Sequence, residues 1–452
     1  MVSRDGGLCR VKLPGGRLTA AQAVVIADTS EALAAGVIEL TNRANLQLRG
    51  VKPGAEPRVS ESLIAAGLGP HVSAFGNERQ LARQTAVADD VRNLMLSAAA
   101  GLDVDALCDT TPLAAQILAR LENEPRFAAL SPKFSILLDG GESLAALDHP
   151  HDLWLSPMPA ATNVEPMFVF GFAGQPTTTP GGALAAVRSS DVPAVVQALL
   201  HTFIDLAAAD HRRMRDLLQV QSADDIADRA AATAGVTLQR NAAVRAWQRA
   251  AATPLRRFGA WPQRGTGDAG MWYVGAQAPL GRIDAPTLRA IAQLSLSYAG
   301  GSFRLTPWQG VLIPDVHERN VPHVERELDR LGMIRDAQAP LGRLIACTGS
   351  TGCAKGAADT KGDARELAAR LHTGLEVHLS GCLRSCAAAH RAPWTLLAVG
   401  PARYDLYRRT PGRAGLGHRP DDATRFGKRL ATQMTIEDIA LRLNQQDRNT
   451  LP

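Results

Sequence analysis

The amino-acid sequence predicts an α+β protein built by duplication of one structural unit. The segment Gly-Arg-Leu-Thr-Ala at 16–20 recurs as Gly-Arg-Ile-Asp-Ala at 281–285. The same offset, without a gap, aligns Leu40-Thr41 with Leu305-Thr306. Because similarity at a fixed spacing is the mark of a repeated structural unit, we expect the two segments to fold alike.

Each repeat has the pattern strand, helix, strand, strand. A short run with β propensity comes first, and a Thr or Asp that can cap a helix follows it. The periodic apolar positions predict helices at about 19–35 and 284–299, each followed by a hairpin, at 38–48 and 303–313. This pattern is half of a ferredoxin-like sandwich, present twice. We assign residues 1–72 and 265–335 to the two half-domains.

A longer α/β stretch follows each half-domain, and we assign it to residues 73–235 and 336–402. In the first stretch we expect helices near 77–90 and 112–122 and strands at 91–96, 134–138 and 167–170. In the second we expect a helix near 357–371 and strands at 343–346, 375–379 and 394–399, in the same order. Residues 403–452 are treated as a C-terminal extension. Its helix near 435–443 has an apolar stripe, which we expect to pack on the core.

Four cysteines, Cys347, Cys353, Cys382 and Cys386, form Cys-x5-Cys and Cys-x3-Cys pairs in one short stretch of the chain. These spacings are wider than is usual in structural zinc sites, so they favour an iron–sulfur cluster. A zinc site and a set of reduced core thiols are the alternatives. Only the second copy has these cysteines, so the predicted metal site belongs to one half of the duplication. Cys9 and Cys108 are interpreted as small apolar residues.

The composition excludes several classes of protein. With 46% hydrophobic and 21% charged residues among 452, the chain is a globular protein rather than a disordered one. The net charge of +5 comes from dispersed residues without a Lys/Arg block, so we expect no nucleic-acid partner. The N-terminus lacks the apolar stretch of a signal peptide and no run is long enough to span a membrane, so we expect a cytoplasmic protein.

These features resemble the nitrite and sulfite reductase superfamily, whose members duplicate a ferredoxin-like half and a siroheme-type α/β domain. Its members bind a 4Fe-4S cluster through the same two cysteine pairs, and the resemblance extends to about residue 402. It implies a duplicated nitrite/sulfite reductase-like fold with Cys347, Cys353, Cys382 and Cys386 as cluster ligands. Within the superfamily, the glycine-rich segment 6–16, the compact length and the Ser-Gly-Cys-x-x-x-Cys-Ala site are most similar to the monooxygenases of aerobic cobalamin biosynthesis.

The reductases also have three motifs that place cationic side chains over the tetrapyrrole. Arg43 matches the first, in Thr41-Asn42-Arg43-Ala44-Asn45-Leu46-Gln47, and Arg92 the second, in Asp89-Asp90-Val91-Arg92-Asn93. Lys133 matches the third, Lys-Phe-Lys, only in part, because Ser135 stands where the reductases have the second lysine. The resemblance implies that Arg43, Arg92 and Lys133 bind substrate. Each of them could instead make a structural ion pair.

The resemblance implies a monooxygenase that hydroxylates precorrin-3A at C-20 with O2 and closes the ring A acetate lactone. A second iron, non-haem or siroheme, would be needed beside the cluster. No Gly-x-Gly-x-x-Gly motif opens a helix after a strand, so NADH-derived electrons are expected to arrive through a separate ferredoxin or reductase. His390 is a candidate neighbour of the cluster or the substrate, and no other catalytic residue is assigned. The alternatives are a siroheme sulfite or nitrite reductase and a non-catalytic tetrapyrrole or electron carrier.

Overall fold

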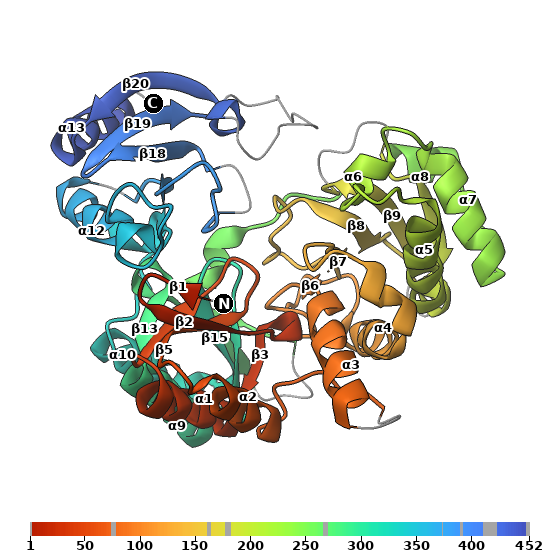
Figure 1. The fold of residues 1–452 in the computed structure, drawn as a ribbon, viewed down its shortest axis with the longest axis horizontal. Helices are drawn as coiled ribbons and strands as arrows, with labels where there is room; N and C mark the ends of the chain where they lie inside the picture. The colour runs from red at the N-terminus through yellow and green to blue at the C-terminus, as the bar shows by residue number, and fades with distance from the viewer. Residues whose placement is uncertain are drawn as a thin grey trace.

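The structure is a computed structural model that describes residues 2–73, 78–160, 164–176, 182–264, 270–372, 374–388, 392–409 and 423–448. The described strands form four five-stranded sheets. Two of the sheets belong to one lobe, in red and teal, and each of the other two forms the centre of an α/β lobe (Figure 1). The predicted α+β class is confirmed.

The first lobe contains both ferredoxin-like halves, and the halves exchange a strand. One sheet has the order β1 (Val2–Ser3), β2 (Gly6–Val11), β5 (Leu46–Val51), β4 (Val37–Leu40) and β13 (Arg282–Asp284). The other has the order β11 (Gly259–Pro262), β12 (Met271–Gln277), β15 (Gly310–His317), β14 (Ser302–Leu305) and β3 (Arg17–Thr19). Thus β13 of the second copy pairs with β4 of the first, and β3 of the first pairs with β14 of the second. The exchange covers an edge of each sheet and joins the halves into one unit.

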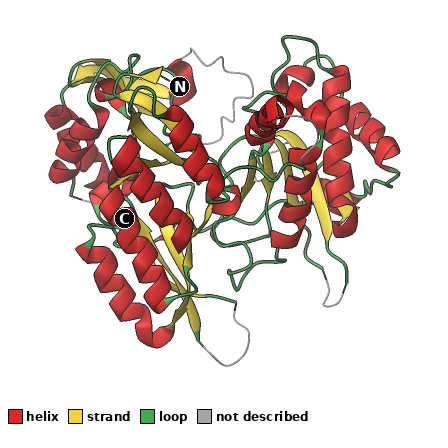
Figure 2. Ribbon diagram, turned by 60° about the horizontal axis from the view of Figure 1, so that its bottom comes forward, coloured by secondary structure: helices red, strands yellow, loops and turns green. Residues whose placement is uncertain are grey.

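The helices of this lobe follow the predicted repeat. Helices α1 (Ala20–Leu33) and α9 (Ala285–Tyr298) begin at equivalent positions of the two copies, as do α2 (Glu56–Ala65) and α10 (Val321–Arg330). Thr19 and Asp284 cap α1 and α9 with their side-chain oxygens, as the sequence predicts. The helices lie side by side on one face of the strands (Figure 2), and residues of both halves share one hydrophobic core.

The two α/β lobes have the same sheet topology. The first has the order β10 (Ala185–Arg188), β9 (Met167–Gly174), β8 (His151–Pro157), β7 (Ile136–Leu138) and β6 (Leu94–Leu96). The second has the order β16 (Leu344–Ala346), β17 (Val377–Ser380), β18 (Trp394–Gly400), β19 (Arg403–Arg408) and β20 (Lys428–Met434). In each, three parallel strands are followed by two antiparallel ones. The duplication therefore includes the α/β lobes.

The lobes differ more in their helices. The first contains α3 (Glu78–Val91), α4 (Thr111–Asn123), α5 (Val192–Leu206), α6 (Met214–Leu217), α7 (Ala223–Ala234) and α8 (Ala242–Ala246). The second contains α11 (Pro340–Arg343), α12 (Thr360–Arg370) and α13 (Ile436–Arg448). The apolar stripe of α13 packs on the core through Ile436, Ile439, Ala440 and Leu443, as expected.

Two features of the α/β lobes are absent from the sequence prediction. The predicted strand at 394–399 is β18, which corresponds in topology to β8, and β8 itself was not predicted. It begins with His151 and Asp152, whose polarity suggests a loop although both residues are buried. The second sheet also continues past residue 402, because β19 and β20 complete it. Residues 403–408 and 428–434 thus supply two strands of this sheet.

Candidate active site

The four candidate cluster ligands lie in two neighbouring loops of the second α/β lobe. Cys347 directly follows β16, and Cys353 lies in the same loop, which leads to α12. Cys382 and Cys386 lie in the loop after β17, which pairs in parallel with β16. Because the carboxyl ends of parallel strands meet at one edge of a sheet, the topology brings the two cysteine pairs together there.

Backbone and small residues surround the first of these thiols closely. The N–H of Gly381 donates to Sγ of Cys347 over 3.2 Å, and a Cβ at position 381 would lie 3.3 Å from that sulfur. Oγ1 of Thr360 lies 3.6 Å from the same sulfur. A thiolate with an N–H donor and without bulky neighbours is suited to iron–sulfur ligation.

The four sulfurs share one electrostatic environment. Burial raises the pKa of the Cys386 thiol, and the charges of Cys382, Cys347 and Cys353 raise it further. Within the described ranges, no three Cys, His, Asp or Glu side chains are arranged to hold a single metal ion. The donor set, four thiols on two adjoining loops, fits a polynuclear cluster, and the ligand assignment itself stays a prediction.

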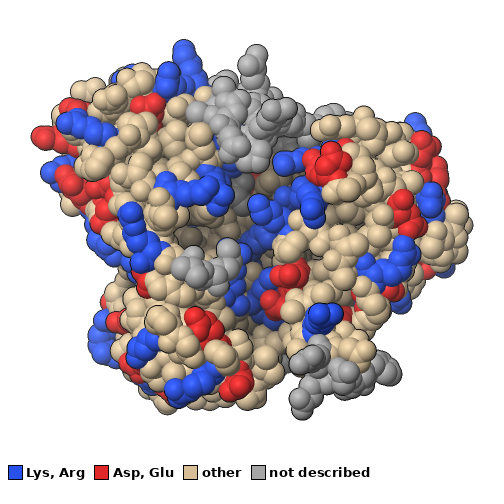
Figure 3. All heavy atoms as spheres, viewed as in Figure 1, with Lys and Arg blue, Asp and Glu red and all other residues tan. Residues whose placement is uncertain are grey.

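A small pocket, with a volume of about 20 Å³, lies between the ferredoxin-like lobe and the first α/β lobe. Its lining includes Arg43, Asn45, Arg92, Met95, Ser135 and His151. Lys and Arg side chains line the hollow between the lobes on the face seen in Figure 3. The pocket therefore has a cationic wall, and two of the three predicted substrate-binding residues contribute to it.

Arg43 projects from the turn between β4 and β5. Oγ1 of Thr41 accepts hydrogen bonds from the N–H groups of Arg43 and Asn45, and Ala44 has a left-handed backbone, with φ of 55°. Burial within the hollow lowers the pKa of Arg43, and the charge of Arg213 lowers it further. The Arg43 guanidinium makes no hydrogen bond or ion pair with any residue that the structure describes. It is available to an anionic ligand.

Arg92 lines the same pocket, but its guanidinium is already bonded. It pairs with Asp89 at 2.7 Å and donates to the carbonyl oxygens of Leu68 at 2.9 Å and Gly69 at 3.3 Å. Only 7% of the residue is exposed. These contacts join the first half-domain to α3, which favours the structural role that the sequence left open.

Lys133 and Ser135 differ in position although they stand close together in the chain. Lys133 is exposed and is not among the residues that line the pocket. Ser135 lines the pocket and is 5% exposed, and its N–H donates to Asp152 over 2.9 Å. The pocket therefore has a serine where the reductase motif has its second lysine.

His151 is a pocket residue that the sequence analysis missed. It is 4% exposed, and neither of its ring nitrogens has a hydrogen-bond partner in the described structure. Burial, with the positive charges of His149, Arg43 and Arg213, holds its pKa well below the usual range. The segment His149-Pro150-His151-Asp152 was the available signal, but its spacing matches no standard metal motif. The other histidine singled out, His390, lies outside the described residues.

A hydrogen bond connects the turn that carries Arg43 to the second cysteine loop. Asn42, adjacent to Arg43, donates from its side-chain amide to the backbone carbonyl of Cys386 over 3.3 Å. A ligand held by Arg43 would therefore lie next to the loop of a candidate cluster ligand. This arrangement suits electron transfer from a cluster to a group bound in the hollow.

Comparison with known families agrees with this architecture. The nitrite/sulfite reductase ferredoxin-like half domain matches residues 1–66 and 264–331. The nitrite and sulphite reductase 4Fe-4S domain matches residues 87–230. The chain belongs to the nitrite and sulfite reductase superfamily. Within the superfamily match, the 4Fe-4S domain falls on the first α/β lobe, which has only Cys108, whereas the four candidate ligands lie in the second lobe.

Curated relatives of two kinds have similar sequence identity to this chain. Ferredoxin–nitrite reductases from Zea mays and Synechococcus elongatus are 26% and 28% identical, and each alignment covers 84% of this chain. The alignments cover 67% of the maize protein and 73% of the cyanobacterial protein. The chain therefore spans about two thirds of the length of the maize relative. A precorrin-3B synthase from Sinorhizobium sp is 26% identical, with 90% of this chain and 80% of the relative covered.

A solved structure shows the same fold. The Mycobacterium tuberculosis NirA protein superposes with a TM-score of 0.75 at 20% identity, over 98% of this chain and 80% of that one. Membership of this superfamily makes the chain an enzyme of the oxidoreductase class. Its domains are those of a superfamily related to tetrapyrrole chemistry. None of the described helices is both long and apolar enough to cross a bilayer.

Proposed function

We propose that this protein is a precorrin-3B synthase, a monooxygenase that hydroxylates precorrin-3A at C-20 and forms the ring A acetate lactone. One oxygen atom of O2 enters the substrate and the other leaves as water, which takes two electrons and two protons. The electrons come one at a time from a separate donor, a ferredoxin or an NADH-dependent reductase.

The observation that carries this proposal is that the pocket has Ser135 where the reductase motif has its second lysine. Reduction of nitrite or sulfite needs cationic groups and proton donors concentrated around a small oxyanion. Here Ser135 replaces one lysine, Lys133 lies outside the pocket lining, and Arg92 is bonded to Asp89. The free guanidinium of Arg43 suits a carboxylate on the edge of a large substrate better than an oxyanion at the reacting centre.

The residues have distinct roles in this scheme. Cys347, Cys353, Cys382 and Cys386 would hold a 4Fe-4S cluster, which supplies single electrons, and a second iron, non-haem or siroheme, supplies oxygen activation. Arg43 binds an acetate or propionate group of the precorrin by charge-assisted hydrogen bonds and so orients the macrocycle. Arg92 and Lys133 were predicted to share this role. We now assign the first binding contact to Arg43, and Arg92 supports the wall of the pocket.

The share of each relative that the alignment covers is consistent with this choice. The alignment covers 80% of the precorrin-3B synthase relative, against 67% of the maize and 73% of the Synechococcus elongatus nitrite reductase. A siroheme-dependent nitrite or sulfite reductase is the second candidate, because the nitrite reductases are equally similar in sequence.

Labelled oxygen distinguishes the two functions. Anaerobically purified protein is given a strong artificial electron donor and either precorrin-3A with ¹⁸O2, nitrite or sulfite. We expect one labelled oxygen in the tetrapyrrole product and no useful reduction of either anion. Rapid turnover of nitrite or sulfite, together with an unchanged precorrin, would assign the chain to the reductases. A protein that binds the precorrin but turns over none of the three would be a carrier.

A further inference from the structure

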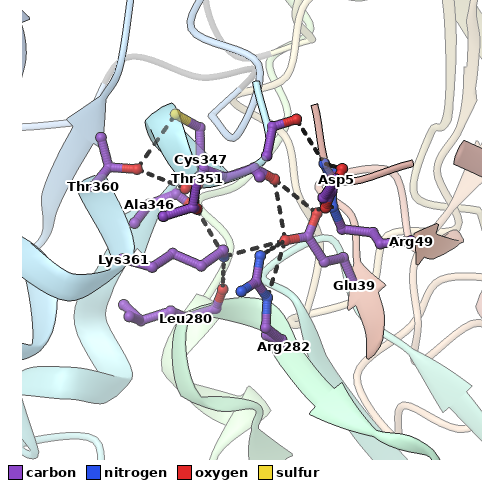
Figure 4. Close-up of polar contacts among 12 residues, drawn as sticks. Asp5, Glu39, Arg49, Leu280, Arg282, Ala346, Cys347, Thr351, Thr360 and Lys361 are labelled. Carbon is purple, nitrogen blue, oxygen red and sulfur yellow. Dashed lines mark hydrogen bonds and ion pairs between the residues drawn. The ribbon is translucent and has the colours of Figure 1, made fainter. Parts of the chain in front are cut away.

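A buried carboxylate lies beneath the first cysteine loop. Glu39, on β4, is 8% exposed and accepts hydrogen bonds from Arg282 at 2.6 Å and Arg49 at 3.3 Å. Its third donor is the hydroxyl of Thr348, whose Oγ1 lies 3.0 Å from Oε2 and 3.1 Å from Oε1. Nζ of Lys361 is 3.9 Å away from Glu39. Figure 4 shows Arg49, Arg282 and Lys361 converging on Glu39 from both halves of the duplication and from the second α/β lobe.

This network holds the loop of Cys347 and Cys353 near both ends. Thr348 directly follows Cys347, so its bond to Glu39 fixes the backbone beside that thiol. Gly352 directly precedes Cys353, and its carbonyl accepts from Nη2 of Arg49 over 3.1 Å. Arg49 is itself paired with Asp5 at 2.7 Å and with Glu39. The ferredoxin-like sheet therefore holds the positions next to two candidate ligands.

The network also sets the charge beside Cys347. Burial opposes ionisation of Glu39, but the charges of Lys361, Arg49 and Arg282 outweigh it and lower the pKa of this carboxyl. The network thus combines three cationic side chains, Arg49, Arg282 and Lys361, with two carboxylates, Glu39 and Asp5. Lys361 reaches the loop itself, because its ammonium donates to the carbonyl oxygen of Ala346 over 3.2 Å.

The other copy has a contact at the equivalent place. Arg304 occupies the position of the second repeat that Glu39 occupies in the first, and it lies on β14, as Glu39 lies on β4. Its guanidinium donates to the carbonyl oxygens of Ala98 at 2.9 Å and Ala100 at 2.6 Å, in the loop that follows β6. The same position of the repeat thus reaches the loop after the first parallel strand in both copies. The residue at this position is a carboxylate, Glu39, only in the copy that contacts the cysteine loop.

We propose that Glu39 is a positioning residue for the iron–sulfur cluster, which orients the Cys347 loop through Thr348 and, with its cations, sets the electrostatic environment of the cluster. This inference rests on the cluster ligands assigned under the proposed function, but not on the reaction or the substrate. It can therefore be tested on the cluster alone.

The positioning role is tested by Thr348→Val, which removes the hydroxyl and preserves the shape of the side chain. Release of iron to a ferrous chelator is followed in reconstituted protein, with Thr351→Val as the matched control. Thr351 is exposed in the same loop, and within the described part of the chain its hydroxyl bonds only to the carbonyl of Thr348. We expect at least tenfold faster release from Thr348→Val than from wild type or the control. Equal rates in the two variants would overturn the positioning role.

The electrostatic role is tested by Glu39→Gln, with the midpoint potential of the cluster measured by a redox titration followed by EPR. Loss of the carboxylate leaves its cations unbalanced, which favours the reduced cluster. We expect the potential to rise by about 59 mV or more, a tenfold change for a one-electron couple. The control is Glu31→Gln, an exposed carboxylate on α1 that pairs with Arg289. A potential equal to that of wild type would overturn the electrostatic role, and wild type that holds no cluster would overturn the ligand assignment itself.

Discussion

The side-chain amide of Asn42 donates to the backbone carbonyl of Cys386 over 3.3 Å. Asn42 belongs to the ferredoxin-like half and precedes Arg43, whereas Cys386 belongs to the second α/β lobe. One hydrogen bond therefore joins the turn that presents a cation to the pocket and the loop that carries a candidate cluster ligand. The predictions below separate these two functions, binding in the pocket and ligation in the loops.

Replacing Cys382 by Ser should remove most of the iron and sulfide and abolish turnover, because a hydroxyl is a poor ligand for this type of cluster. Metal and sulfide analysis of reconstituted protein is the measurement. Cys108→Ser is the control, since this half-buried thiol has a pKa raised to about 12 by burial and by Glu142, and it lies in the other lobe. A Cys382→Ser protein with about four irons and four sulfides would contradict the ligand set.

Arg43→Ala should weaken tetrapyrrole binding and leave the cluster intact. If the guanidinium pairs with a desolvated carboxylate of the ligand, the loss is about 2–5 kcal/mol of binding free energy. Titration with precorrin-3A, with the cluster absorbance followed in parallel, measures both effects. Wild-type affinity in this variant would exclude the carboxylate contact.

Arg92→Ala should act mainly on stability. The substitution leaves the carbonyl oxygens of Leu68 and Gly69 and the carboxylate of Asp89 without their donor. Because Asp89 is partly exposed to solvent, we expect a loss of about 2–3 kcal/mol in the free energy of unfolding rather than the full cost of a broken buried pair. Chemical denaturation measures it. A stable variant with weak tetrapyrrole binding would return Arg92 to the substrate site.

Ser135→Lys tests why the pocket is unsuited to small oxyanions. The added ammonium would restore the cationic group of the reductase motif at a position that lines the pocket. We expect the variant to bind nitrite or sulfite more tightly than wild type, as seen by perturbation of the visible spectrum. Rapid reduction of either anion by the wild-type protein would show that the missing lysine is not decisive.

His151 should make stability fall at acid pH. Its folded pKa lies well below the unfolded value of about 6.5, because burial and then the charges of His149, Arg43 and Arg213 disfavour the imidazolium. As the pH falls, His151 is therefore protonated in the unfolded chain at a higher pH than in the folded protein. The contribution of neutral His151 to the free energy of unfolding is fully present above about pH 6.5. Below that pH it falls by up to about 1.4 kcal/mol for each pH unit.

Denaturation of wild type and His151→Asn at pH 7.5 and pH 5.5 measures this contribution. The variant should lose less stability over the same interval, because Asn does not titrate. Parallel losses in the two proteins would show that other groups, such as the neighbouring His149, account for the acid sensitivity.

The sequence by itself determined the repeat and its local structure. The constant offset between the copies places α1 and α9, and the caps at Thr19 and Asp284 start them, because helix periodicity and capping depend on residues close in the chain. The cysteine pairs were equally visible, because each pair lies within one loop. The candidate ligand set and the superfamily could therefore be inferred without coordinates.

Only the tertiary structure decided how these parts meet. The exchange of β3 and β13 pairs strands from different copies of the repeat, far apart in the chain, and no local pattern encodes such a pairing. Arg43 and Arg92 both match motifs of the superfamily, yet among the described residues only the Arg92 guanidinium is bonded, to Asp89, Leu68 and Gly69. His151 and Glu39 are polar residues whose burial depends on neighbours from distant segments. Desolvation and charge at these positions follow from the packing of distant segments, which the order of residues does not reveal.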